Sequence, residues 1–142
     1  MNNNYKYDAG DPSNFVFSKE QLTGIEVILD RDLMELGVHS VFLIDMAGNV
    51  IASVDNGKME HDIYSLAALA AGNFGAVSTM ARLIGEDEFS LLFHKGRTQS
   101  IHFSKVMDHF LLITIFGKES SLGFLRLKVA EATEKIIEIL NS

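Results

Sequence analysis

The chain contains no cysteine and a single proline among its 142 residues. Without cysteine it can form no disulfide framework and offers no thiol for catalysis. Basic residues are scarce as well, because 12 Lys and Arg stand against 19 Asp and Glu, for a formal charge of −7. Nucleic-acid binding normally needs a cluster of Lys and Arg, and the sequence has none. These absences argue against disulfide or thiol chemistry and against a nucleic-acid partner.

Long apolar runs and export signals are missing too. No apolar run reaches the roughly 20 residues that span a bilayer, and the opening MNNNYKYDAGDPSN lacks the basic segment and apolar run of a signal peptide. We therefore expect a soluble cytoplasmic protein without membrane insertion. Hydrophobic residues make up 47% of the chain and charged residues 22%, which excludes global disorder. We expect a flexible polar tail over residues 1–14 and one domain over residues 15–142.

Caps and apolar spacing predict a helix near each end of this domain. Ser18 and Gln21 have the spacing of a capping box, and apolar residues then recur at helical spacing as far as Gly37. Ser120 or Ser121 can cap a final helix that keeps one face apolar. Both helices therefore have an apolar face to bury.

Short β-rich runs separated by turn residues predict five strands. They cover residues 38–45, 50–53, 89–94, 99–106 and 109–116. The first and last runs contain nearly continuous apolar stretches, which are typical of central strands covered on both faces. A helix over residues 65–85 completes the order αββαβββα. We predict an α/β sandwich, in which a five-stranded sheet carries this middle helix on one face and the two terminal helices on the other.

The middle helix, SLAALAAGNFGAVSTMARLIG, has almost no charged residues. At 100° per residue, one stripe is expected to face the core: Leu66, Leu69, Ala70, Asn73, Val77, Met80, Ala81 and Ile84. The opposite face carries small residues where a solvated face normally has Glu, Lys or Gln, and each Gly in a helix costs about 1 kcal/mol relative to Ala. We interpret this face as a contact surface; a plain Ala-rich exterior is the alternative. Its residues are Ala68, Ala71, Gly72, Gly75 and Thr79, with Arg82 as the only charge.

Motifs for catalysis or cofactor binding are absent from the sequence. The five histidines are scattered without the spacing of a metal site, and neither a phosphate-binding loop nor a nucleophile elbow occurs. Glu86, Asp87 and Glu88 could in principle supply paired carboxylates, but a solvated loop is the simpler interpretation. We expect no catalytic residue, no metal and no cofactor, so function should reside in surfaces.

Four blocks of sequence together resemble one known family. They are VFLIDMAGNVIA, SLAALAAGNFGAVSTMARLIGEDEF, FHKG and LLITIFGKESSLGFLRLKV. From about Leu22 to Leu140 the chain resembles the Roadblock/LC7 domain, most closely its bacterial gliding-motility and polarity members. The Asp-x-x-Gly turn from Asp45 to Gly48 and the Ser-Leu-Gly that opens the last helix follow in the family's order. The resemblance implies an antiparallel sheet and dimerisation through the third strand and the second helix.

The resemblance also implies a function. Members that work with GTPases are dimeric activators of small Ras-like GTPases, and they remodel the GTPase's own switch and active-site residues rather than insert an arginine finger. Gly75 and Thr79 match the partner-facing surface of such members, and Ala68, Gly72 and Arg82 join them by helical geometry. A scaffold that binds a GTPase or motor complex without accelerating hydrolysis is the alternative. A small-molecule hydrolase would need a nucleophile and a base that the sequence does not show.

The third strand carries the prediction of a homodimer. Phe89, Leu91 and Phe93 alternate with a serine, a leucine and a histidine, so both faces of the strand are partly apolar. In the assumed sheet order this strand is a bare edge, and bare edges aggregate unless they are paired or protected. We expect it to pair with a second copy around a twofold axis, which buries Phe74 and Leu91. A strand covered by the chain's own loops is the alternative.

Overall fold

The computed structural model describes residues 16–57, 62–90 and 92–142. The predicted tail over residues 1–14, together with Phe15 and Leu91, lies outside the described residues. The elements are α1 (Lys19–Leu33), the short 3₁₀-helix η2 (Met34–Leu36), β1 (Val38–Asp45), β2 (Val50–Asp55), α2 (Ile63–Leu83), β3 (Leu92–Lys95), β4 (Gln99–Val106), β5 (Phe110–Gly117) and α3 (Leu122–Leu140). This order confirms the αββαβββα prediction.

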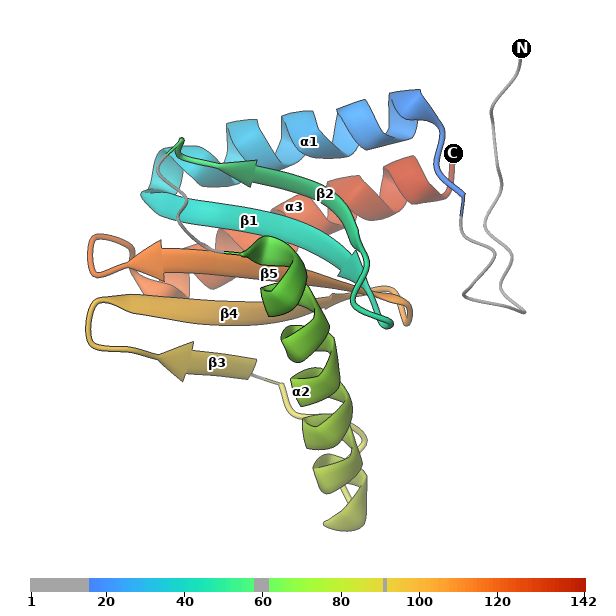
Figure 1. Cartoon of the computed structure of the whole chain (residues 1–142), viewed down its shortest axis with the longest axis vertical. Coiled ribbons are helices and arrows are strands. Elements are labelled where there is room, and N and C mark those ends of the chain that lie inside the picture. The colour runs from blue at the N-terminus through green and yellow to red at the C-terminus, as the bar shows by residue number, and fades with distance from the viewer. Residues whose placement is uncertain (1–15, 58–61, 91) are drawn as a thin grey trace.

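The strands form one antiparallel sheet of five strands in the order β2-β1-β5-β4-β3. Every residue of β5 is buried, as are six of the eight in β1. These two strands are central because their continuous apolar runs have a hydrophobic layer on each side. The short strand β3 lies at an edge of the sheet, as Figure 1 shows.

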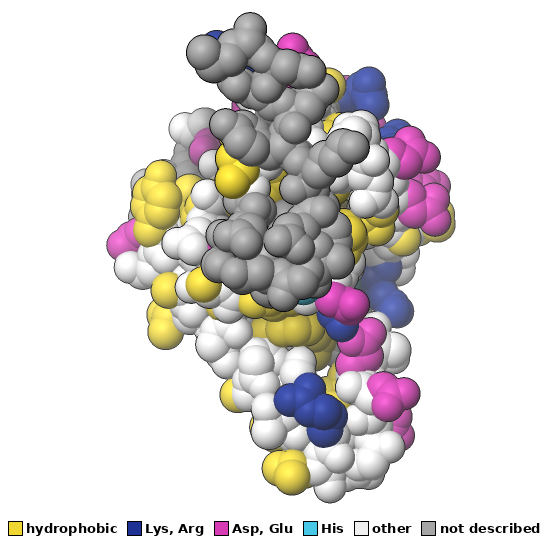
Figure 2. All heavy atoms as spheres, turned by 90° about the vertical axis from the view of Figure 1, so that its right-hand side faces the viewer, with side chains coloured by type: hydrophobic (Ala, Val, Ile, Leu, Met, Phe, Trp, Pro, Cys, Tyr) yellow, Lys and Arg dark blue, Asp and Glu magenta, His cyan; other side chains and the backbone are white. Residues whose placement is uncertain are grey.

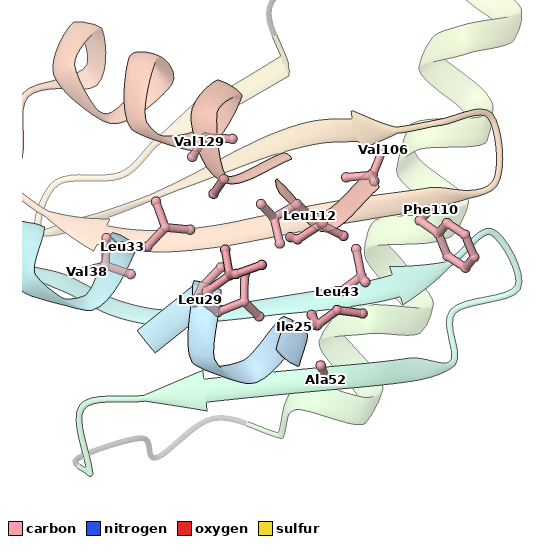
Figure 3. Packing of buried hydrophobic residues seen from close by; sticks show 14 of the residues in the cluster. Ile25, Leu29, Leu33, Val38, Leu43, Ala52, Val106, Phe110, Leu112 and Val129 are labelled. Atoms are coloured by element: carbon pink, nitrogen blue, oxygen red, sulfur yellow. The ribbon is translucent and has the colours of Figure 1, made fainter. Parts of the chain in front are cut away.

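Helices α1 and α3 cover one face of the sheet and α2 crosses the other (Figure 1). The larger core cluster lies under α1 and α3, where Ile25, Leu29 and Leu33 point toward the strands (Figure 3). The predicted apolar face of α3 is confirmed, because Leu125, Val129, Ala132, Ile136 and Leu140 are all buried. Both terminal helices are therefore fixed to the sheet along their length.

The predicted capping box at the start of α1 is confirmed. The backbone N–H of Gln21 donates to Oγ of Ser18 at 3.0 Å, and the N–H of Ser18 donates to Oε1 of Gln21 at 2.9 Å. After η2 the chain turns at Gly37, whose φ of +79° is left-handed and suits glycine. The local signals thus place this helix without help from the rest of the fold.

The third predicted strand begins later than expected. We predicted a strand from Phe89, but β3 starts at Leu92. The preceding residues form a loop instead, in which Oε2 of Glu88 accepts a hydrogen bond from Nζ of Lys105 in β4 at 3.0 Å and Phe89 lines a cleft together with Phe74. Phe89 is therefore a loop residue rather than a strand residue.

Candidate functional site

Helix α2 begins at a fully formed cap. Oδ1 of Asp62 accepts the backbone N–H groups of Tyr64 and Ser65 at 3.1 Å each, and Oδ2 accepts the hydroxyl of Ser65 at 2.7 Å. These hydrogen bonds, that from the Ser65 hydroxyl above all, lower the pKa of the Asp62 carboxyl. A carboxylate at this position also complements the positive end of the helix dipole.

The first half of α2 is anchored on the sheet. Ala67, Ala70 and Ala71 belong to the core cluster between this helix and the sheet. The turn between β1 and β2 also approaches closely, because a Cβ at Gly48 would lie 2.8 Å from the Cα of Ala68. Figure 1 shows that the second half of α2 runs on beyond the sheet. The helix is therefore fixed at one end and projects at the other.

The predicted core stripe of α2 is wrong for its largest side chains. Leu69 is 72% exposed, Met80 58% and Ile84 72%, and Leu83 beside them is 81% exposed. Two causes account for this difference. The helix is rotated so that Ala67 joins the buried side, and its second half has no sheet beneath it. Leu69, Met80, Leu83 and Ile84 form what we call the apolar strip.

The small-residue face is exposed, with one correction. Ala71 was predicted to lie on it, but the rotation of the helix puts Ala71 in the core at 9% exposure. Ala68, Gly72, Gly75 and Thr79 are exposed, and we call them the small-residue strip. A Cβ added at Gly72 or Gly75 would meet no atom within 4 Å. Intramolecular packing therefore does not explain these glycines.

Polar groups at the far end of the small-residue strip are tied together. The hydroxyl of Thr79 donates to the backbone oxygen of Gly75 at 3.0 Å, and Arg82 donates to the same hydroxyl at 3.3 Å. Arg82 is thus oriented along the strip, and it forms no ion pair within the described residues. Arg82 therefore places a positive charge beside a surface of small residues.

The apolar strip lies on the same side of α2 as the edge strand β3. Asn73, which projects between Leu69 and Met80 on the helix surface, holds His94 of β3 through Oδ1 and Nε2 at 3.4 Å. The apolar strip and the edge of β3 therefore form one continuous surface. The small-residue strip lies next to it on the helix.

The remaining residues predicted at the dimer contact lie partly inside the protomer. Phe93 is half-buried and stacks on Phe116, with ring centroids 5.9 Å apart. Phe74 is half-buried and lines a cleft of about 280 Å³ together with Phe89 and Leu92. Leu91 lies outside the described residues.

Sequence reasoning missed the apolar strip of α2. The signal that could have revealed it is the excess of apolar residues around the whole helix in the sequence.

One titratable group within β4 has a strongly shifted pKa. His102 is 5% exposed, and its Nδ1 has no hydrogen-bond partner. Burial lowers its pKa to about 4, with a smaller contribution from the charge of Arg126, so the imidazole is neutral near pH 7. Within the described ranges, no group of three His, Asp or Glu side chains could hold a metal ion.

The composition of α2 also fits a bilayer span. The helix has 21 residues with a mean hydropathy of 1.2, and 17% of the apolar window is buried. However, its anchored half packs on the sheet through three alanines. The exposed apolar area on the projecting half is also of the kind that marks a protein contact.

Comparison with known proteins agrees with this fold. Residues 25–116 match the Roadblock/LC7 domain family. MglB of Myxococcus xanthus is 35% identical, with 88% of this chain and 93% of that chain covered and a TM-score of 0.79. The gliding protein MglB of Thermus thermophilus is 28% identical over 88% and 94% of the two chains, again with a TM-score of 0.79. A Roadblock/LC7 domain from Streptomyces avermitilis, 15% identical over 82% and 98% with a TM-score of 0.71, shares the fold.

A search of curated protein sequences gives no significant match. The family match spans more than half of the chain, and the likeness to the Myxococcus protein extends over nearly all of the described part. The chain therefore belongs to the Roadblock/LC7 family.

Proposed function

We propose that this protein is a cytoplasmic homodimer that regulates a small Ras-like GTPase of the MglA kind, in cell polarity or gliding motility. The dimer forms through the apolar strip of α2 and the edge of β3. The small-residue strips of the two copies then lie side by side as a platform for the GTPase.

The exposed apolar strip is the observation that carries the proposal. Side chains as large as Met80 and Leu83 are largely exposed in the isolated chain, next to an unpaired strand edge. Such a surface favours association, because burying a large aliphatic side chain contributes about 1.5 to 3 kcal/mol. Pairing around a twofold axis covers both the strip and the edge.

The small-residue strip supports a second, flatter contact. Gly72 and Gly75 leave the helix backbone open, so a partner's backbone can approach it closely. We infer that the platform acts on catalytic groups that belong to the GTPase, as the family resemblance implies. The likeness to MglB gliding proteins supports a role in gliding motility, and the family resemblance of the sequence implies the GTPase partner.

The test is a GTP-turnover assay of the cognate GTPase with and without this protein at saturating concentration. We expect GTP hydrolysis to accelerate about a hundredfold or more, because the platform would reposition misplaced catalytic groups of the GTPase. Binding without acceleration would favour the alternative, a scaffold that joins a GTPase or motor complex. Absence of binding would overturn the proposal.

The homodimer is tested separately by light scattering. We expect the mass of two chains at micromolar concentration and the mass of one chain for Leu83→Glu. Wild-type protein that remains monomeric at this concentration would contradict the dimer.

A further inference from the structure

A cleft lies where several parts of the fold meet. It has a volume of about 280 Å³, and its walls come from α2, from the loop that returns to β3, from β4 and from α3. Figure 1 shows the returning loop beside the projecting half of α2. A second hollow of about 180 Å³ adjoins the first, because the two have several lining residues in common. We call the two together the α2–α3 cleft, and their combined size is that of a small-molecule site.

The part that both hollows share is apolar. Its residues are Phe74, Val77, Phe89, Leu92 and Phe103. Phe89 is 36% exposed, and Phe74 and Leu92 are half-buried, so these side chains still have surface to offer. Aromatic rings in such a wall favour a ligand with an apolar body.

The polar part of the cleft contains two cations. Lys105 already binds Glu88 at 3.0 Å and Asp108 at 3.2 Å. Arg126, in contrast, is exposed and forms no ion pair within the part of the chain that the structure describes. A guanidinium can hold a carboxylate through two parallel hydrogen bonds. Arg126 therefore offers a place for one carboxylate.

A buried imidazole lines the same polar part. The Nδ1 atom of His102 has no hydrogen-bond partner among the described residues, and neither has the buried hydroxyl of Thr114, its register partner in β5. Burial lowers the pKa of His102 most and the charge of Arg126 lowers it further, so the imidazole is neutral near pH 7 and the guanidinium is close to it. Buried polar side chains are rarely left unpaired, which points to a ligand that hydrogen-bonds this imidazole.

The surrounding charge limits which anions can bind. Glu86, Asp87 and Glu88 precede Phe89 in the returning loop, and Figure 2 shows acidic side chains along one flank of the lower half of the molecule. The whole chain has a formal charge of −7. This field repels a bare inorganic anion, whereas an anion with an apolar body also gains from burying that body against the aromatic rings.

We propose that the α2–α3 cleft binds a small organic carboxylate with an aromatic or aliphatic body. The carboxylate pairs with Arg126 and accepts a hydrogen bond from His102, and the body lies against the shared apolar wall. Because the walls come from both α2 and α3, a bound molecule connects the projecting half of α2 to the rest of the fold. This site goes beyond the proposed function and depends neither on the homodimer nor on the GTPase.

Titration of the full chain, followed by NMR, tests the site. We expect 3-phenylpropanoate and octanoate to shift the backbone signals of the cleft residues with saturation and a dissociation constant of about 1 mM, as suits ligands of this size. The ring nitrogen signals of His102 should shift at the same ligand concentrations. The uncharged 3-phenylpropanamide should bind about tenfold more weakly or worse, because it cannot pair with the guanidinium. Acetate, which lacks the apolar body, should not saturate.

A variant and a matched control identify the cation. Arg126→Ala should weaken binding of both carboxylates about tenfold or more and leave binding of the amide unchanged. Arg31→Ala makes the same chemical change on α1, where the arginine pairs with Asp32 and does not line the cleft. It should bind all the probes like wild type. Circular dichroism confirms that both variants are folded, and the comparison of acid with amide on wild-type protein needs no variant.

Several results would overturn the inference. They are a failure of both carboxylates to saturate, equal binding of acid and amide, and unchanged binding by folded Arg126→Ala. Acetate that bound as tightly as 3-phenylpropanoate would reduce the site to a single surface charge and would also overturn it. None of these measurements depends on GTP hydrolysis or on the number of chains in the assembly, so failure of this site and failure of the proposed function are distinguishable.

Discussion

Replacing Gly75 should make the protein more stable and less able to bind its partner. Position 75 lies inside an exposed stretch of α2, and a Cβ there meets no atom within 4 Å. Gly75→Ala should therefore gain the full difference in helix propensity, about 1 kcal/mol. For a chain of this size the gain corresponds to a rise in melting temperature of about 3 to 4 °C. Gly72→Ala should behave in the same way, because its surroundings are equally open.

A larger side chain at the same position separates stability from binding. Gly75→Arg also improves helix propensity, but its long side chain stands on the surface that we assign to the GTPase. We expect affinity for the GTPase to fall about tenfold or more, equivalent to about 1.4 kcal/mol. Binding is measured by titration calorimetry and stability by thermal unfolding at one fixed protein concentration, because dimer stability depends on concentration.

Gly24→Ala is the matched control for this prediction. It makes the same chemical change in α1, but its Cβ would lie 3.1 Å from Cδ1 of Ile139, which must shift. Its gain in stability should therefore be smaller, and its binding unchanged. A lower melting temperature for Gly75→Ala would show that position 75 is not open. A folded, dimeric Gly75→Arg protein that bound the GTPase like wild type would refute the platform.

The other predictions concern the dimer, the arginines and pH. Met80→Glu should weaken the dimer without unfolding the chain, because Met80 is 58% exposed in the protomer; light scattering and circular dichroism would show both. Arg82→Ala and Arg97→Ala should each keep most of the stimulated GTP hydrolysis. An arginine finger contributes a factor of about 10³ to 10⁵ to the hydrolysis rate, so a hundredfold loss of stimulation with intact binding would identify a finger. The depressed pKa of His102, about 4 against 6.5, means that the unfolded chain binds a proton over that window and the folded chain does not. Stability should therefore fall by roughly 2 kcal/mol from pH 6.5 to pH 5, and urea unfolding of His102→Gln should lack this part of the pH dependence.

Local sequence signals were enough to predict the elements that depend on local chemistry. The capping box of Ser18 and Gln21, the β1 run and the apolar stripe of α3 lie where the sequence puts them. Each of these patterns lies in a single environment: the capping box is a local set of hydrogen bonds, and the β1 run and the α3 stripe pack in the core along their whole length. The arrangement of layers could be predicted because both faces of the central strands are apolar, so the apolar faces of the helices have to cover both sides of the sheet.

The environment of α2 could not be predicted in the same way. Its apolar residues extend around most of the helix, so periodicity gives no sharp core direction, and small alanines rather than leucines make the contact with the sheet. Leu69 and Met80 look like core residues, yet the protomer leaves them exposed. The start of β3 was misplaced because the alternation of residues from Phe89 onward resembles a strand, whereas residues 86–90 form a loop.

Because only the first half of α2 is anchored on the sheet, the backbone hydrogen bonds of its two halves should open at different rates. Amides near Ala67 and Ala70 lie over the sheet and should exchange with solvent deuterium only on global unfolding. Amides in the projecting half donate within a helix that has no sheet beneath it there, and the N–H of Glu86 closes the end of that helix by donating to the oxygen of Ala81. That half should open by local fraying in the protomer and become protected as a second copy and then a GTPase cover it. The surface that makes the contacts is thus also the part of the chain that becomes more ordered with each association.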